Sequence, residues 1–161
     1  MSNLFSDWLH NSLLKINEDF FSGALQPENE SDFKCHLYHH LILTKPSNEM
    51  RITTEYHHYE LAGSIDMVLG EEINGFQPRI CIELKDSSGK SRTFLFMKNR
   101  LDNNIQVLRY MKKINRKVKL YVLYWFWGAK NGIDEKVMEE MNKLQNEYSD
   151  ITFLYGPVRT R

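Results

Sequence analysis

Three ionisable residues, Asp66, Glu83 and Lys85, stand within short apolar runs of the chain. Side chains alternate along a strand, so we expect Glu83 and Lys85 on one face and Ile82 and Leu84 on the other. A turn between the two runs brings Asp66 alongside Glu83. Two carboxylates and an ammonium in a partly buried pocket suit a divalent cation with oxygen ligands, with the lysine near its water. The alternative is an exposed Glu83–Lys85 pair on a half-solvated strand, with Asp66 ending a turn.

The spacing of apolar residues predicts the elements that must hold these side chains. Helical spacing marks residues 3–20, a second stretch from a Ser31 cap to Pro46, the run from Phe94 to Met111, and residues 134–148. Runs of β-branched and aromatic residues mark strands at Arg51–Tyr59, Ser64–Gly70, Arg79–Lys85, Lys117–Phe126 and Ile151–Tyr155. The unbroken apolar run from Leu120 to Phe126 is typical of a strand buried on both faces.

The order of these elements predicts an α/β fold. Three consecutive strands form an antiparallel meander, and a helical crossover then leads to the buried strand, which implies a mixed central sheet flanked by helices. With 161 residues and no linker, we expect one domain over residues 1–161. Its parts are an N-terminal helix at 3–20, a core at about 28–127, and a C-terminal helix and strand at 134–155.

Composition narrows the class of protein. Lysine plus arginine and aspartate plus glutamate each number 21, so the formal net charge is zero. A neutral chain is not a bulk polyanion binder, and any nucleic-acid affinity must come from a local patch or from bound cations. Two cysteines in apolar runs, no secretory leader and no apolar run near 20 residues predict a cytoplasmic protein without a membrane partner.

The acidic pair and its lysine resemble a known motif. Asp66 before a hydrophobic strand, then Glu83-Leu84-Lys85 after the apolar Ile80-Cys81-Ile82, is similar to the motif of the PD-(D/E)xK, or restriction-endonuclease-like, nuclease superfamily. The resemblance covers roughly residues 28–127 and includes the order helix, three-strand meander, helix, strand. Ile65 stands where the motif has proline.

The resemblance implies a magnesium-dependent nuclease that leaves 5′-phosphate and 3′-hydroxyl ends. Asp66, Glu83 and the carbonyl of Leu84 would ligate Mg²⁺ (or Mn²⁺), and Lys85 would orient or help deprotonate the attacking water. The partner is then a nucleic acid, with DNA favoured over RNA. Because 161 residues leave no room for a target-recognition domain, double-strand cleavage requires a homodimer or a protein partner.

Further catalytic candidates follow from the same resemblance. Superfamily enzymes often add an acidic residue from the preceding helix or strand, for which Glu30 and Glu55 are the two choices. Glu30 can equally complement a helix dipole. On the helix after the lysine, Gln106 is our choice for a residue that faces the site, and a solvated helix face is the alternative.

Basic residues of the same helix and its end are candidates for phosphate contacts. The residues are Lys98, Arg109, Lys112, Lys113 and Arg116, four of them in the one basic cluster of the chain, Arg109 to Lys119. The alternative is a solvated helix end whose cations complement the dipole. A zinc site at His36 and His40 beside Cys35 is disfavoured, because the chain has no CxxC and no HExxH.

Two other functions remain open at this stage. The first is a catalytically silent member of the same fold that binds nucleic acid or protein. The second is a structural or assembly subunit in which the motif is coincidental, and for it Mg²⁺ would not change thermal stability.

Overall fold

A computed structural model describes residues 2–87, 94–126, 129 and 131–159 of the chain. The described residues form a five-stranded sheet in the order β1-β2-β3-β4-β5. The strands are β1 (Met50–His57), β2 (Ser64–Glu72), β3 (Phe76–Ser87), β4 (Lys119–Phe126) and β5 (Thr152–Gly156). The helices are α1 (Ser2–Phe21), α2 (Glu30–Leu43), α3 (Phe94–Asn99), α4 (Asp102–Ile114) and α5 (Glu135–Glu147). The predicted α/β class with a mixed sheet flanked by helices is confirmed.

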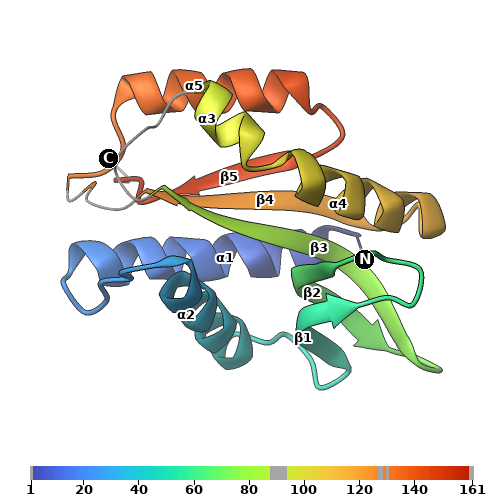
Figure 1. The fold of residues 1–161 in the computed structure, drawn as a ribbon. Helices are drawn as coiled ribbons and strands as arrows, with labels where there is room; N and C mark the ends of the chain where they lie inside the picture. Colours follow the sequence, from blue (N-terminus) through green and yellow to red (C-terminus); the bar gives the residue numbers. More distant parts are fainter. Residues whose placement is uncertain (1, 88–93, 127–128, 130, 160–161) are drawn as a thin grey trace.

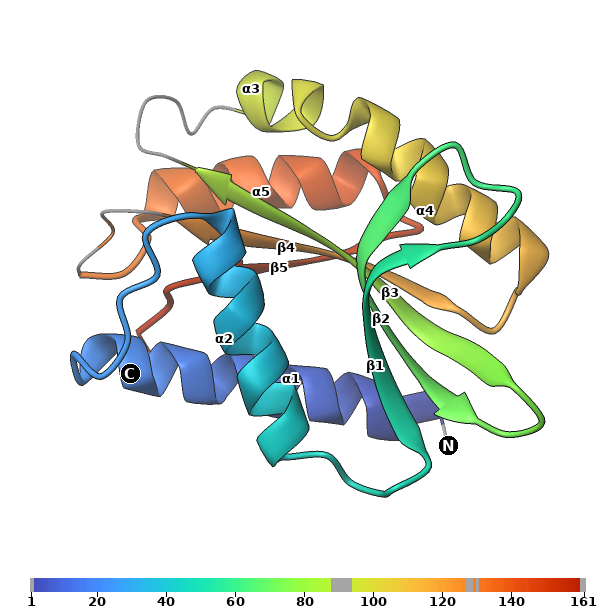
Figure 2. The same ribbon diagram turned by 60° about the horizontal axis from the view of Figure 1, so that its bottom comes forward.

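Two layers of helices enclose the sheet. Figures 1 and 2 show α1 and α2 on one side and α3, α4 and α5 on the other. β1, β2 and β3 pair antiparallel, whereas β4 pairs parallel with both β3 and β5. Parallel neighbours need crossover connections, which α3 with α4 and then α5 supply. The strong twist of the sheet turns β1 and β2 away from β4 and β5 (Figure 2).

Each helical layer buries its own hydrophobic core. The core under α1 and α2 includes Met67, Leu84 and Trp125, and the core under α4 and α5 includes Ile65 and Val68. β4 contributes to both, since every residue from Leu120 to Phe126 is buried. The apolar run on this strand therefore correctly predicts a strand that is buried on both faces.

Several element boundaries differ from the sequence prediction. The N-cap of α2 is Asn29, whose side chain accepts from the Asp32 N–H over 3.0 Å, rather than Ser31. β3 begins at Phe76, directly after the positive-φ residues Asn74 and Gly75 that make the hairpin turn. The helical stretch from Phe94 is broken into α3 and α4 at Arg100.

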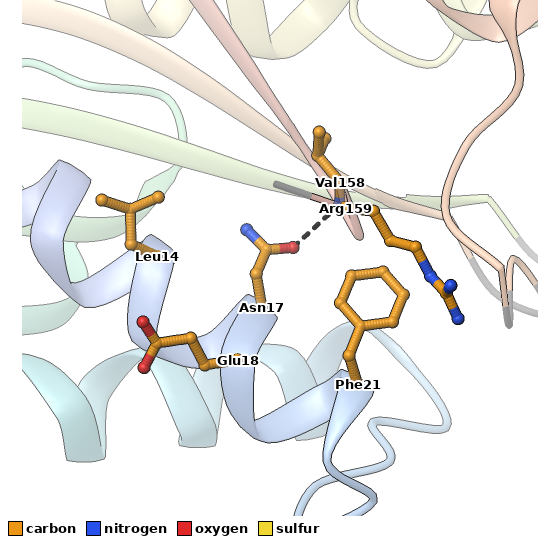
Figure 3. Close-up of a pocket in the computed structure, with 6 residues that line it drawn as sticks. All are labelled: Leu14, Asn17, Glu18, Phe21, Val158 and Arg159. Carbon is orange, nitrogen blue, oxygen red and sulfur yellow. Dashed lines mark hydrogen bonds between the residues drawn. The ribbon is translucent and has the colours of Figure 1, made fainter. Parts of the chain in front are cut away.

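The C-terminal segment packs against the first helix. The Val158 N–H donates to the Asn17 side chain over 2.9 Å, and the Arg159 guanidinium lies 5.1 Å from the centre of the Phe21 ring. With Leu14 and Glu18 these residues line a cavity of about 250 Å³ (Figure 3). No helix in the described part of the chain is both long and apolar enough to span a membrane.

Candidate functional site

Glu83 and Lys85 lie side by side on β3 and face α4. Their side chains are only 5% and 10% exposed, and the Lys85 ammonium donates to Oε1 of Glu83 over 2.7 Å. Asn104 of α4 donates a second hydrogen bond to the same oxygen. Leu84, between the pair in the chain, is buried on the opposite face against α1 and α2. The two residues are therefore a buried ion pair on one face of a central strand, not an exposed pair on a solvated one.

Asp66 of β2 reaches the same region. The register that pairs Met67 with Ile82 brings Asp66 across from Glu83. Oδ2 of Asp66 accepts from the Leu84 N–H over 2.8 Å. Because the N–H and C=O of one strand residue point to the same neighbouring strand, the Leu84 carbonyl also faces the side of Asp66. The fold thus brings two carboxylates, one backbone carbonyl and one lysine into a single region.

The strand backbone is irregular next to Asp66. Glu55, which follows Thr54 on β1 where the ladder pairs Thr54 with Met67, has a φ of 48°. Ile65 packs in the core under α4 and α5, whereas Met67 packs in the core under α1 and α2. Strict alternation of β2 is therefore interrupted between these two residues. The interruption leaves the Asp66 carboxylate between the two cores, with 17% of its side chain exposed.

Burial and the neighbouring charge of Asp66 act against ionisation of Glu83. Burial, and then the neighbouring charge of Asp66, raise the pKa of Glu83 to about 7, although Lys85 acts in the opposite direction. The fold therefore holds two adjacent carboxylates in a poorly solvated place, where ionising both is costly. Added positive charge at this point favours the ionised form of Glu83.

Lys34 of α2 contacts two carboxylates at one side of the site. Its ammonium is bound to Oε1 of Glu55 and lies 3.3 Å from Oδ1 of Asp66. Burial acts to lower the pKa of Lys34, but the bonds and charges of the two carboxylates raise it overall. Glu55 also accepts from the Ser64 hydroxyl over 3.0 Å, and its bond to Lys34 lowers its pKa. Glu55 is thus linked to Asp66 through a shared lysine.

Glu30 of α2 lies at another side of the site, next to Asp86. It is the first residue of α2, and its Oε2 accepts from the Asp86 N–H over 3.3 Å. The Arg100 guanidinium lies 3.1 Å from Oδ1 of Asp86 and 3.8 Å from Oε2 of Glu30. Burial raises the pKa of Glu30, against the positive charge of Lys85. The two acidic candidates therefore flank the central pair from different elements.

The donor set fits a hard cation that keeps some of its water. Among the described residues, no three Asp, Glu, His or Cys side chains come together closely enough to hold a metal ion. Asp66, Glu83 and the Leu84 carbonyl instead offer a short set of oxygen donors. Mg²⁺ is commonly bound through one or two carboxylates with several retained waters.

The helix residue that reaches the site is Asn104, not Gln106. Gln106 is exposed, and two residues along a helix correspond to a rotation of about 200°. Asn104 is half-buried and follows the apolar stripe of α4, three residues after Leu101 and four before Leu108. In the sequence, Asn104 is a polar residue at the spacing of the apolar residues of this helix, and this could have indicated its role.

The predicted phosphate contacts lie mostly outside the site. Lys98 is paired with Glu147, Arg109 makes two 2.8 Å bonds to Asp150, and Lys112 donates to the Val118 carbonyl. Lys113 and Arg116 are exposed near the C-terminal end of α4. Lys113 is nine residues beyond Asn104, which is about 14 Å along a helix axis. In the described part of the chain, these partners of Lys98, Arg109 and Lys112 therefore do not include Asp66 or Glu83.

The histidines of α2 show no zinc arrangement. Nε2 of His40 lies 3.1 Å from Oδ2 of Asp19 on α1, and burial lowers the pKa of His40. Cys35 is exposed. In the part of the chain that the structure describes, these residues are not part of any group that could hold a metal ion.

Comparisons with protein-family models, with curated proteins and with solved structures found no match to this chain. Its function must therefore be argued from the site itself.

Proposed function

We propose that this chain is a metal-dependent nuclease with a restriction-endonuclease-like fold, which hydrolyses phosphodiester bonds and leaves 5′-phosphate and 3′-hydroxyl ends. The observation that carries the proposal is the meeting of Asp66 and Glu83 on adjacent strands beside the buried Lys85. The antiparallel meander followed by a helical crossover to β4 supports the fold assignment.

In this proposal Asp66, Glu83 and the Leu84 carbonyl hold Mg²⁺ or Mn²⁺. When bound there, such a cation would supply a lowered pKa for its water and stabilisation of charge on the scissile phosphate. Two features of the chain support this assignment. First, the atoms that would ligate the metal are all oxygens. Second, the pKa of Glu83 is raised, so a nearby positive charge would favour its ionised form.

The remaining residues hold the carboxylates and place the water. Lys85 fixes Oε1 of Glu83, and its other ammonium hydrogens can orient the attacking water. Asn104 holds the same oxygen from α4 and is a positioning residue. Lys34 joins Asp66 to Glu55 and neutralises part of their charge. Glu30 stands on the far side with Arg100.

A nuclease assay tests the proposal. Labelled single- and double-stranded DNA and RNA are incubated with Mg²⁺, with Mn²⁺ or with EDTA. We expect metal-dependent cleavage by the wild type, and loss of cleavage in Lys85→Ala. Lys15→Ala is the matched control, because Lys15 is an exposed lysine on α1 that pairs only within its own helix. Circular dichroism verifies that each variant is folded. Cleavage that persists in both Asp66→Ala and Glu83→Ala refutes the proposal.

A specific observation favours a second candidate, a non-catalytic binding module of the same fold. The ammonium groups of Lys34 and Lys85 already lie against Asp66 and Glu83. Two internal cations can replace the charge of a divalent ion, as in a site that has lost its chemistry. Isothermal titration with MgCl₂ and MnCl₂ beside the nuclease assay separates the two functions, because a site whose charge the two lysines replace neither binds the cation nor cleaves nucleic acid.

A further inference from the structure

A groove between α2 and β1 adjoins the candidate site. Lys34, Cys35, Tyr38, Thr54 and Glu55 line it, and its volume is about 340 Å³. This volume is within the range of sites that hold small organic groups. Lys34 and Glu55 belong to both places, because the Lys34 ammonium also lies 3.3 Å from Asp66. A ligand bound in the groove is therefore adjacent to the site formed by Asp66 and Glu83.

Tyr38 gives this groove an aromatic wall. Its side chain is 40% exposed. It follows Lys34 by four residues, so the ring lies one turn along the same face of α2 as the ammonium that reaches Asp66. Cys35 and Thr54 also line the groove. A ligand with a planar ring can stack that ring on Tyr38 while the rest of the ligand lies near Asp66.

The cations that flank the site are held by the protein itself. Lys34 is bound to Glu55 and Asp66, Lys85 to Glu83, and Arg100 to Asp86 and Glu30. Binding of duplex DNA draws its affinity from cations that contact many phosphates and displace counterions. Proteins that bind unpaired strands combine a cationic groove with aromatic rings on which the bases stack. The groove with Tyr38 fits the second kind of recognition.

We infer that the groove binds an unpaired nucleobase next to the scissile phosphate, stacked on Tyr38, and that the substrate is single-stranded nucleic acid or an unpaired end. This inference rests on the proposed nuclease function. A base within a duplex is stacked on its neighbours and cannot enter the groove without being extruded. Stacking is tolerant of sequence because every base has a π-face, so we expect little sequence preference.

Fluorescence anisotropy tests the inference with a labelled mixed-sequence 12-mer, in DNA and RNA form, and with its duplex. Binding is measured in Ca²⁺, an oxygen-seeking cation of looser geometry than Mg²⁺, and in EDTA. We expect the single strand to bind at least tenfold more tightly than the duplex. Tyr38→Ala weakens single-strand binding roughly 5- to 100-fold, from the usual energy of one base–aromatic stack. Tyr38→Phe keeps the ring and stays within about twofold of the wild type.

The matched control is His39→Ala, the next residue on α2, which is exposed and does not line the groove. Equal or tighter binding of the duplex, or unchanged binding by Tyr38→Ala, overturns the inference. A wild-type dimer in sedimentation that Tyr38→Ala dissociates also overturns it, since the groove is then an interface between copies of the chain.

The Mg²⁺ cleavage assay distinguishes a failure of this inference from a failure of the proposed nuclease function. Cleavage that prefers duplex overturns the role of the groove alone. Single-strand binding that depends on Tyr38, without any cleavage, supports the groove and overturns the nuclease.

Discussion

The backbone N–H of Leu84 donates a 2.8 Å hydrogen bond to the carboxylate of Asp66, so a main-chain group of β3 orients an acidic side chain of β2. The other carboxylate oxygen of Asp66 faces Lys34. This bond lies where the backbone of β1 and β2 is irregular, beside the positive φ of Glu55. The backbone of β3 therefore holds Asp66 close to Glu83, independently of any cation.

Substitutions of Asp66 separate its structural role from its proposed catalytic one. Asp66→Asn keeps an oxygen that accepts from Leu84 but loses the negative charge. Asp66→Ala leaves that N–H without its acceptor, so we expect a loss of about 1–2 kcal/mol in the free energy of unfolding, measured in urea. We expect neither variant to cleave nucleic acid. An Asp66→Asn protein with wild-type cleavage contradicts the assignment of Asp66 as a ligand.

Glu83 gives the stability of the metal-free protein an unusual pH dependence. Burial and Asp66 raise its pKa in the fold from the ordinary 4.5 to about 7. The folded protein then binds more protons than the unfolded chain between these values, so stability falls as the pH rises from about 4.5 to about 7. The slope approaches about 1.4 kcal/mol per pH unit if Glu83 alone titrates.

Urea unfolding in EDTA at several pH values measures this effect. Glu83→Gln does not titrate and is the reference, since the histidines that ionise in the same range are present in both proteins. We expect the difference between wild type and variant to shrink toward pH 5. A difference that does not depend on pH contradicts a raised pKa for Glu83.

The sequence predicted the fold where a pattern is repeated over many residues. Alternation predicted the meander, and the apolar run at β4 predicted the crossover to a strand buried on both faces. The break at Arg100 was missed because Leu101 continues the apolar stripe from α3 into α4, so periodicity alone shows one helix. The cap of α2 was placed two residues late because Asn29 and Ser31 are both good capping residues.

Only the part of the site that depends on strand geometry could be predicted from the sequence. Alternation puts Glu83 and Lys85 on one face, and the hairpin brings Asp66 across from Glu83. The contacts of Lys34 and Asn104 depend on how α2 and α4 pack on the sheet, which no short-range pattern encodes. Choosing Gln106 from the polar face of the helix missed Asn104, which lies at the edge of the buried face.

Metal binding is expected to raise thermal stability. A ligand that binds only the folded state stabilises it by about 2.7 kcal/mol at a hundredfold excess over Kd. For a domain of this size, each kcal/mol corresponds to about 2–4 °C in Tm. We therefore expect MgCl₂ at a hundred times Kd to raise the Tm of the wild type by roughly 5–10 °C over EDTA.

A distant carboxylate supplies the control for this shift. Asp150→Asn alters an acidic residue that pairs with Arg109, away from the site, and should keep the shift. Asp66→Asn and Glu83→Gln should lose it. A wild-type protein with no Mg²⁺ or Mn²⁺ shift contradicts the metal-dependent nuclease. It favours a binding module whose lysines replace the cation, or an assembly subunit in which the motif is coincidental.

Asn104 and Gln106 form a matched pair on α4, because both are side-chain amides and only the first touches Glu83. Residues that orient a metal ligand typically contribute 10- to 100-fold to metal affinity or activity. We expect Asn104→Ala to weaken Mg²⁺ binding or kcat roughly 10- to 100-fold. Asn104→Asp should not restore either, because aspartate lacks the N–H donor and adds a third carboxylate beside Asp66 and Glu83. Gln106→Ala should leave both within about twofold, since it removes an exposed side chain. Isothermal titration with MgCl₂ and single-turnover cleavage measure the two effects, and equal losses in Asn104→Ala and Gln106→Ala would show that α4 acts through its surface rather than through Glu83.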